Sequence, residues 1–134
     1  MGQGSIIGYE INEKTCQISF YNEKDLEPDT LEVDTDNYQI PLIIGKLRDT
    51  WAYGKEAKRL VTIKDGFTAT RLLSKSLAGD KIEFGEETYD AVWLLSQFIQ
   101  MSLQSFPEID GIVFTVPSLS EEMAQMLRGI AVRM

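Results

Sequence analysis

The sequence contains no histidine, and its only cysteine is Cys16. Without histidine, the Ser-His-Asp and Cys-His arrangements of many hydrolases are excluded. A single thiol cannot form a disulfide within the chain, and one cysteine without histidine argues against structural zinc. Any metal would therefore be a hard cation held by carboxylates. The cysteine content fits a reducing compartment, so we expect a cytoplasmic protein.

Basic residues are also scarce. Thirteen Lys and Arg stand against 21 Asp and Glu, which gives a formal net charge of −8. A nucleic-acid surface needs a basic patch, so we expect no nucleic-acid partner. No apolar run reaches the ~18 residues of a membrane span, and the first residues lack the features of a signal peptide, so we expect no membrane partner. Gly45 and Gly54 each precede a lysine, but neither has a glycine five residues earlier, which excludes a Walker A loop.

The 134 residues fit one domain. Two β-rich segments separated by four polar residues predict an opening β-hairpin. Later, a helix with apolar residues at three- and four-residue spacings precedes a nearly continuous apolar run, 109–116, which predicts a strand buried on both faces. We expect strands at residues 5–11, 16–21, 30–33, 41–46, 50–53, 81–84 and 109–116, and helices at 55–60, 69–77, 86–105 and about 118–132.

The ends of the two long helices carry recognisable signals. Glu86 and Glu87 would lie in the first turn of the helix at 86–105, where the helix dipole favours acidic side chains. Ser118 and Glu121 would form a capping box for the last helix. Hairpins come first, and a strand with flanking helices follows, so the order predicts an α/β fold with a mixed sheet and flanking helices.

Four short segments, in chain order, resemble the motifs of one protein family. Residues 7–11 read I-G-Y-E-I, like I-G-I-D-L, and residues 54–58 read G-K-E-A-K, like G-x-x-A-K. Residues 67–73 read F-T-A-T-R-L-L, like F-D-A-K-R-L-I, and residues 112–117 read I-V-F-T-V-P, like A-V-I-T-V-P. The chain thus resembles the N-terminal lobe of the actin/DnaK-like (heat-shock chaperone type) ATPases.

The resemblance implies a ribonuclease H-like (actin-like ATPase) lobe spanning residues 1–134, with a small inserted subdomain at about 34–85. The chain would end before the second lobe, which would be its main partner. In that family the first hairpin turn holds the phosphates of ATP, and the acidic residue before it organises Mg²⁺ through water. The corresponding positions are Asn12, Glu13, Lys14 and Thr15 for the nucleotide and Glu10 for the metal.

The same positions depart from the family pattern. The family's Gly-Thr-Thr turn has lost its glycine here, which restricts close backbone approach to a phosphate. Glu13 adds a like charge, worth about 4 kcal/mol at ~4 Å and an effective dielectric near 20; Lys14 would offset part of it. The family's phosphate-contacting lysine aligns with Thr70, which has no charge. We therefore expect no catalytic residue and no ATP hydrolysis by this chain alone.

Two functions stay open. The first is one lobe of an actin/DnaK-like ATPase domain that binds ATP and Mg²⁺ only together with the second lobe of the full-length protein. The alternative is a catalytically inactive ATPase fold that serves as a scaffold or protein-interaction module, with Glu10 and Lys14 in a solvated turn. A ribonuclease H-like nuclease would need a basic substrate track that the sequence lacks.

Three side chains outside the turn carry further expectations. Trp93 is expected in the core and Cys16 is expected to be buried, while Trp51, with Tyr53, could form a surface for a protein partner. The phosphate-site hypothesis also makes a geometric demand: the two strands within residues 5–21 must pair as neighbours, and the stretch ending at Pro117 must lie in their sheet.

Overall fold

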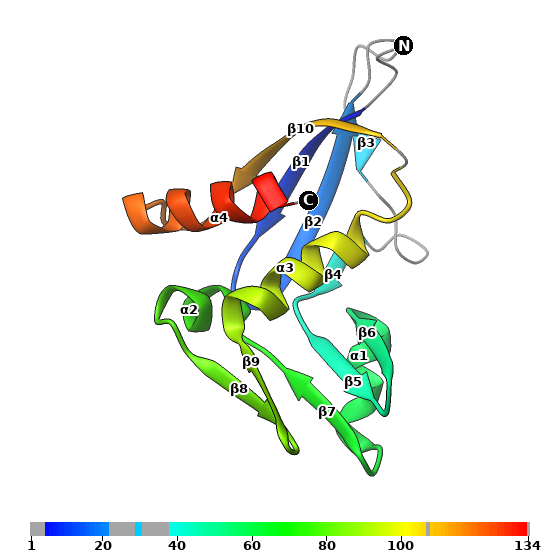
Figure 1. The fold of residues 1–134 in the computed structure, drawn as a ribbon. Helices are drawn as coiled ribbons and strands as arrows, with labels where there is room; N and C mark the ends of the chain where they lie inside the picture. Colours follow the sequence, from blue (N-terminus) through cyan, green and yellow to red (C-terminus); the bar gives the residue numbers. More distant parts are fainter. Residues whose placement is uncertain (1–4, 22–28, 31–37, 107, 134) are drawn as a thin grey trace.

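The computed structural model describes residues 5–21, 29–30, 38–106 and 108–133 (Figure 1). Within these ranges the chain forms a mixed α/β fold with three β-sheets, four α-helices and one 3-10 helix. No helix in the described ranges has the length and hydrophobicity needed to cross a membrane. The predicted α/β class with a mixed sheet is therefore confirmed.

The main sheet is organised around the opening hairpin. Strand β1 (Ser5–Ile11) pairs antiparallel with β2 (Thr15–Tyr21) and parallel with β10 (Ile109–Thr115). On its other edge β2 pairs antiparallel with two short strands, β3 (Asp29–Thr30) and β4 (Gln39–Pro41). The two strands of the hairpin are thus neighbours, and the stretch leading to Pro117 belongs to their sheet, as the phosphate-site hypothesis demands.

Two helices cover one face of the main sheet, α3 (Ala91–Ser102) and α4 (Glu121–Arg133) (Figure 1). Alternate residues of β1 point into the core on this face, where Ile7, Tyr9 and Ile11 are fully buried. Tyr9 Oη lies 2.6 Å from Ser102 Oγ, which ties the middle of β1 to the end of α3. Aliphatic side chains of both helices complete this core: Leu94, Leu95, Ile99, Met123, Leu127 and Ile130.

The second part of the molecule contains the smaller sheets. Its centre is the small sheet, in which β5 (Ile44–Leu47) lies between β6 (Thr50–Tyr53) and β7 (Gly66–Ala69). A separate hairpin is formed by β8 (Lys81–Phe84) and β9 (Glu87–Asp90). The connecting helices are α1 (Lys55–Arg59), the 3-10 helix η1 (Leu60–Thr62) and α2 (Leu72–Leu77). Whether residues 34–85 act as an inserted subdomain stays a prediction.

The helix predicted at residues 86–105 is shorter than expected. Gly85 has a φ of 66°, which closes a two-residue turn and sends residues 87–90 back along β8 as a strand. The helix therefore begins only after Asp90, its N-cap. The placement of Glu86 and Glu87 in a first helical turn was wrong, because glycine and two strand formers, Thr88 and Tyr89, favour a hairpin there.

Two expectations near the C-terminal end were also wrong. Strand β10 has Val113 61% exposed, so this strand is not buried on both faces. It is an edge strand within the described residues, with β1 as its neighbour. The cap of α4 is Ser120 rather than Ser118, since Ser120 Oγ accepts a hydrogen bond from the Met123 N–H at 3.1 Å.

Smaller differences concern individual segments. The strand predicted at 41–46 is split into β4 and β5, because Ile43 N–H bonds back to Pro41 O at 2.8 Å. The segment 69–77 is helical only from Leu72, and of the strand predicted at 30–33 only Thr30 lies within the described residues. Cys16 is buried as expected, at 1% exposure, whereas Trp93 is 40% exposed and lies outside the core.

Candidate functional site

The candidate site lies where β1 and β10 end. These strands are parallel, and Glu10 pairs with Thr115 near the carboxyl end of each. In open α/β sheets, ligands bind in the crevice beyond the carboxyl ends of the strands. The turn that follows β1, residues 12–15, and the segment that leads from β10 to α4 therefore meet at the edge of the sheet where a ligand is expected.

The turn is closed by the side chain of Asn12. Its Oδ1 accepts hydrogen bonds from the backbone N–H groups of Lys14 and Thr15, at 2.8 and 2.9 Å. A backbone bond from Asn12 N–H to Thr15 O, at 3.0 Å, completes the turn. Asparagine side chains commonly bond to the backbone two residues ahead, so the sequence folds this way locally. Consequently, two N–H groups that a phosphate could use are already occupied.

The charged side chains of the turn have mixed signs. Glu10 and Lys14 are exposed, while Glu13 is half-buried. The Oε2 atom of Glu13 is buried, and it has no hydrogen-bond partner among the described residues. A buried carboxylate oxygen favours a nearby cation or donor. Lys14 can reach outward as a point charge for an anion, whereas Glu13 opposes an anion at the same place.

The carboxylates do not form a metal cluster in the described part of the chain. No group of three acidic or cysteine side chains there is close enough to hold a metal ion. A Mg²⁺ ion beside Glu10 would therefore rely on water and on oxygens of its ligand, which Mg²⁺ commonly does with nucleotides. The assignment of Glu10 to a metal and of residues 12–15 to a nucleotide stays a prediction.

A buried network of hydrogen bonds connects the strands on both sides of the turn to α3. Tyr9 Oη, which lies close to Ser102 Oγ, also accepts a weak hydrogen bond from Cys16 Sγ at 3.6 Å, and Ser102 Oγ donates to Ile99 O at 2.8 Å. Burial raises the pKa of the Cys16 thiol to about 12 and raises that of Tyr9 well above its ordinary value. Both groups therefore stay neutral at physiological pH, and their role is to fix the strands that hold the turn.

An open pocket of about 800 Å³ begins beside Thr15. It continues between β4, β6 and α1 to Met101 at the end of α3, and Lys55, Glu56 and Lys58 of α1 lie on its wall. Its volume falls within the range of small-ligand sites. The motif G-K-E-A-K suggested only a family resemblance, and nothing in the sequence indicated that its two lysines line a pocket. Thr70 and Lys75, by contrast, do not line this pocket.

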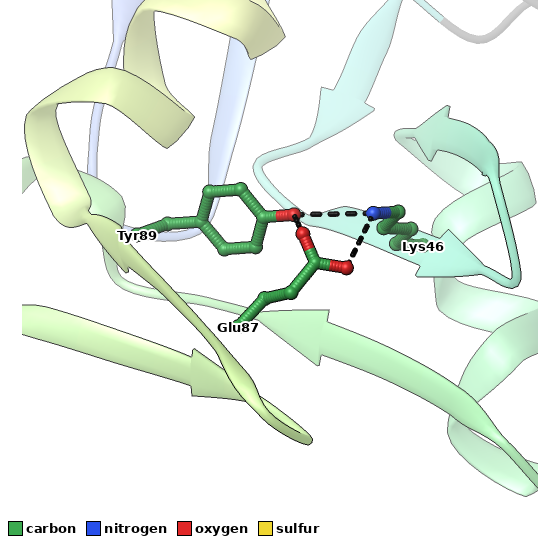
Figure 2. Close-up of polar contacts among 3 residues, drawn as sticks. All are labelled: Lys46, Glu87 and Tyr89. Carbon is green, nitrogen blue, oxygen red and sulfur yellow. Dashed lines mark hydrogen bonds and ion pairs between the residues drawn. The ribbon is translucent and has the colours of Figure 1, made fainter.

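A second cluster joins the small sheet to the β8–β9 hairpin (Figure 2). Lys46 Nζ donates to Glu87 Oε1 and to Tyr89 Oη, each at 3.1 Å, and Tyr89 Oη donates to Glu87 Oε2 at 2.6 Å. Hydrogen bonds from Tyr89 and then Lys46 lower the pKa of Glu87, while the bonds to Tyr89 and Glu87 raise the pKa of Lys46.

Aromatic rings surround this ion pair. Lys46 Nζ lies 5.2 Å from the ring centroid of Trp51, a cation–π distance. Trp51 packs edge-on against Tyr89 and Trp93, at 5.3 and 5.6 Å between centroids. We call the set the aromatic cluster: Trp51, Phe67, Phe84, Tyr89 and Trp93. Trp51 was predicted as part of a surface for a protein partner. In the structure it lies both on the pocket wall and in this cluster.

Comparison with known proteins places the chain within a family and a fold. A model described as the C-terminal part of a family of unknown function, DUF5716, matches residues 27–134. No curated protein matches the chain. Solved structures do match the chain, and one of them is a non-polymerising mutant of MamK bound to AMPPNP, with 12% sequence identity and a TM-score of 0.67.

The MamK match covers 99% of this chain and 39% of the MamK chain, so the present chain spans well under half of that protein. MamK is an actin-like ATPase, and at this identity the likeness shows the fold alone. The actin-like part of the predicted resemblance is therefore confirmed for the fold, while the DnaK part stays a prediction.

Proposed function

Because the chain belongs to the DUF5716 C-terminal family, whose function is unknown, we propose its function from its fold and site. We propose that residues 1–134 are one ribonuclease H-like lobe of an actin-like nucleotide-binding domain. In this proposal the turn at residues 12–15 meets the phosphates of Mg-ATP. The second lobe, outside this chain, supplies the remaining contacts, and residues 34–85 form the inserted subdomain.

One observation carries the proposal: the turn lies at the carboxyl edge of a sheet whose whole fold resembles an actin-like ATPase bound to AMPPNP. Strand β1 lies between the antiparallel strand β2 and the parallel strand β10, so the turn that follows β1 lies at the expected ligand crevice. Lys14 is exposed, so its ammonium can approach an anion at this edge of the sheet.

In this proposal each polar side chain of the turn has its own role. Lys14 would neutralise phosphate charge, and the Thr15 hydroxyl would be a short-range donor beside it. Glu10 would hold water molecules of Mg²⁺, and the ion would bridge phosphate oxygens. Since Asn12 already occupies two N–H groups and Glu13 repels an anion, we infer that this lobe binds nucleotide weakly and needs the second lobe.

Those same two features favour a second candidate, an inactive ATPase fold kept as a scaffold or interaction module. A turn closed on its own side chain has fewer donors for a phosphate, and Glu13 places a carboxylate beside them. In that case the fold would serve partners through its surface and bind no nucleotide.

Calorimetric titration of the intact protein with Mg-AMPPNP separates the two candidates. The proposal predicts saturable heat that is lost in Lys14→Glu and retained in Lys81→Glu, a charge reversal on an exposed strand away from the turn. Absence of binding in the unaltered protein would favour the scaffold. Mg²⁺-dependent ATP turnover that disappears in Glu10→Ala would refute the scaffold.

A further inference from the structure

The pocket beside Thr15 follows the edges of two strands. Three consecutive residues of β4, Gln39–Pro41, and three consecutive residues of β6, residues 51–53, line it. Side chains alternate between the two faces of a strand, so a pocket on one face would meet only every second residue. Contact with consecutive residues means that the pocket opens onto the backbone edge of both strands.

The register of the small sheet shows what β6 presents at that edge. Gly54 N–H bonds to Ile43 O at 2.9 Å, in line with the pairing of Ile44 with Tyr53 and of Lys46 with Trp51. In an antiparallel ladder, bonded and non-bonded pairs alternate. Trp51 and Tyr53 therefore belong to non-bonded pairs, and their N–H and C=O groups point away from β5, toward the pocket.

In the described part of the chain, β6 is the outermost strand of its sheet, and no other strand pairs with its outer edge. The facing strand β4 is a poorer template, because Pro41 has no N–H to donate. The open backbone of β6 thus offers the donor and acceptor pattern that an extended peptide requires.

The pocket walls define the chemistry of such a peptide. Ile40, Tyr53 and Met101 supply apolar surface, and Tyr53 is held by an edge-on contact with Phe98 at 5.7 Å. Lys58 lies exposed on the wall formed by α1, beside Lys55. Glu56 lies on the same wall, but its carboxylate is paired with Arg59 at 3.2 Å, so in a chain with net charge −8 the exposed Lys58 favours an acidic occupant.

We propose that this pocket is a docking site for an extended, acidic segment of another protein. The segment adds as a strand to the outer edge of β6, places an apolar side chain between Ile40 and Tyr53, and pairs a carboxylate with Lys58. Backbone bonds supply affinity, and the apolar and charged contacts select the sequence. The site shares only Thr15 with the proposed nucleotide contacts of residues 12–15, and its backbone, apolar and Lys58 contacts do not depend on a nucleotide.

The test uses the intact protein and the synthetic peptide acetyl-Asp-Val-Asp-Val-Asp-Val-amide, without nucleotide. NMR should show saturable shifts of the Trp51 and Tyr53 amides and slower hydrogen exchange at both. Lys58→Glu should weaken binding by about fivefold or more, the scale of one lost exposed ion pair. The matched variant Lys64→Glu, an exposed lysine outside the pocket wall, should leave affinity unchanged.

Two control peptides make the result specific. A peptide N-methylated at every residue carries methyl groups along both strand edges, so it cannot pair as a strand and should not slow exchange at Trp51 or Tyr53. A peptide with lysine in place of aspartate should bind more weakly than the acidic one. Equal binding of either control, or no shift of the two amides with the acidic peptide, would overturn the proposal. So would shifts of these amides by Mg-ATP alone, since the pocket would then be a nucleotide site.

Discussion

The core of the main sheet and the interior around the small sheet are built from different side chains. Under α3 and α4, fully buried aliphatic residues such as Ile7, Ile18 and Leu94 dominate, with one neutral polar chain through Tyr9. Around the small sheet, aromatic rings surround the Lys46–Glu87 pair, and all of them except Phe84 are partly exposed. The first arrangement suits a rigid platform for the turn, and the second suits an adaptable surface beside a pocket.

The largest expected effect comes from the main core. Leu94→Ala removes a fully buried side chain of α3 and should lower the free energy of unfolding by about 2–5 kcal/mol, because a cavity adds to the lost burial. Val132→Ala on α4, where the side chain is 82% exposed, is the matched control and should change stability little. Denaturant unfolding followed by circular dichroism measures both.

A smaller loss is expected in the aromatic cluster. Trp51→Ala removes a half-buried ring that contacts Tyr89 and Trp93, and it should cost about 2 kcal/mol. Thr50→Ala, at an exposed neighbouring position on β6, serves as the control. A loss as large as that of Leu94→Ala would mean that the two regions are equally rigid, and the comparison would fail.

Alkaline pH should weaken the main core through Cys16. The folded pKa is raised from 9.0 to about 12, so folding is stabilised below pH 9 and this contribution is lost as pH rises toward 12. Between these values the unfolded thiol ionises first, and each pH unit should cost about 1.4 kcal/mol. Cys16→Ala should be less stable overall and show a flatter decline with pH. A parallel decline in both proteins would contradict this cause.

The smallest effect is expected for the ion pair of the second region. The pKa of Glu87 is lowered, so its stabilising effect is present above its ordinary pKa and is lost as pH falls through the folded value. Glu87→Gln should therefore reduce the melting temperature at neutral pH and converge with the unaltered protein in acid. Because Glu87 is largely exposed, salt should diminish the difference. Glu83→Gln is the control.

The sequence located the long strands of the main sheet and, in the second region, β6, α1 and β8, but it missed β7 and β9, for a physical reason. Hydrophobic alternation in residues 5–21 reflects the burial of one strand face, which the pattern of side chains reveals. The apolar run to Val116 indicated a strand but not its exposed face, where Val113 lies. The hairpin of β8 and β9 depends on a single positive φ at Gly85. Trp93 stacks on Tyr89 at 5.2 Å between ring centroids and is 40% exposed, outside the core. Neither the turn at Gly85 nor the stacking of Trp93 on Tyr89 leaves a periodic pattern of apolar residues in the sequence.

The site shows the same limit. The resemblance predicted residues 10 and 12–15 as metal and nucleotide contacts, which stays a prediction; the structure brings these residues to one edge of the sheet. That Asn12 binds the N–H groups of Lys14 and Thr15 could not be predicted, since a turn of four polar residues allows several conformations. The pocket was missed because it needs β4, β6 and α1 together, and no local pattern records that arrangement.

The most direct measurement is an NMR titration of the intact protein with Mg-AMPPNP, observing backbone amides. Binding of phosphates at the turn predicts saturable shifts at Asn12, Lys14 and Thr15, with the amides of the β6 edge unaffected. A titration that leaves those three amides in place, whether or not nucleotide binds elsewhere, would contradict the assignment of the turn to a nucleotide.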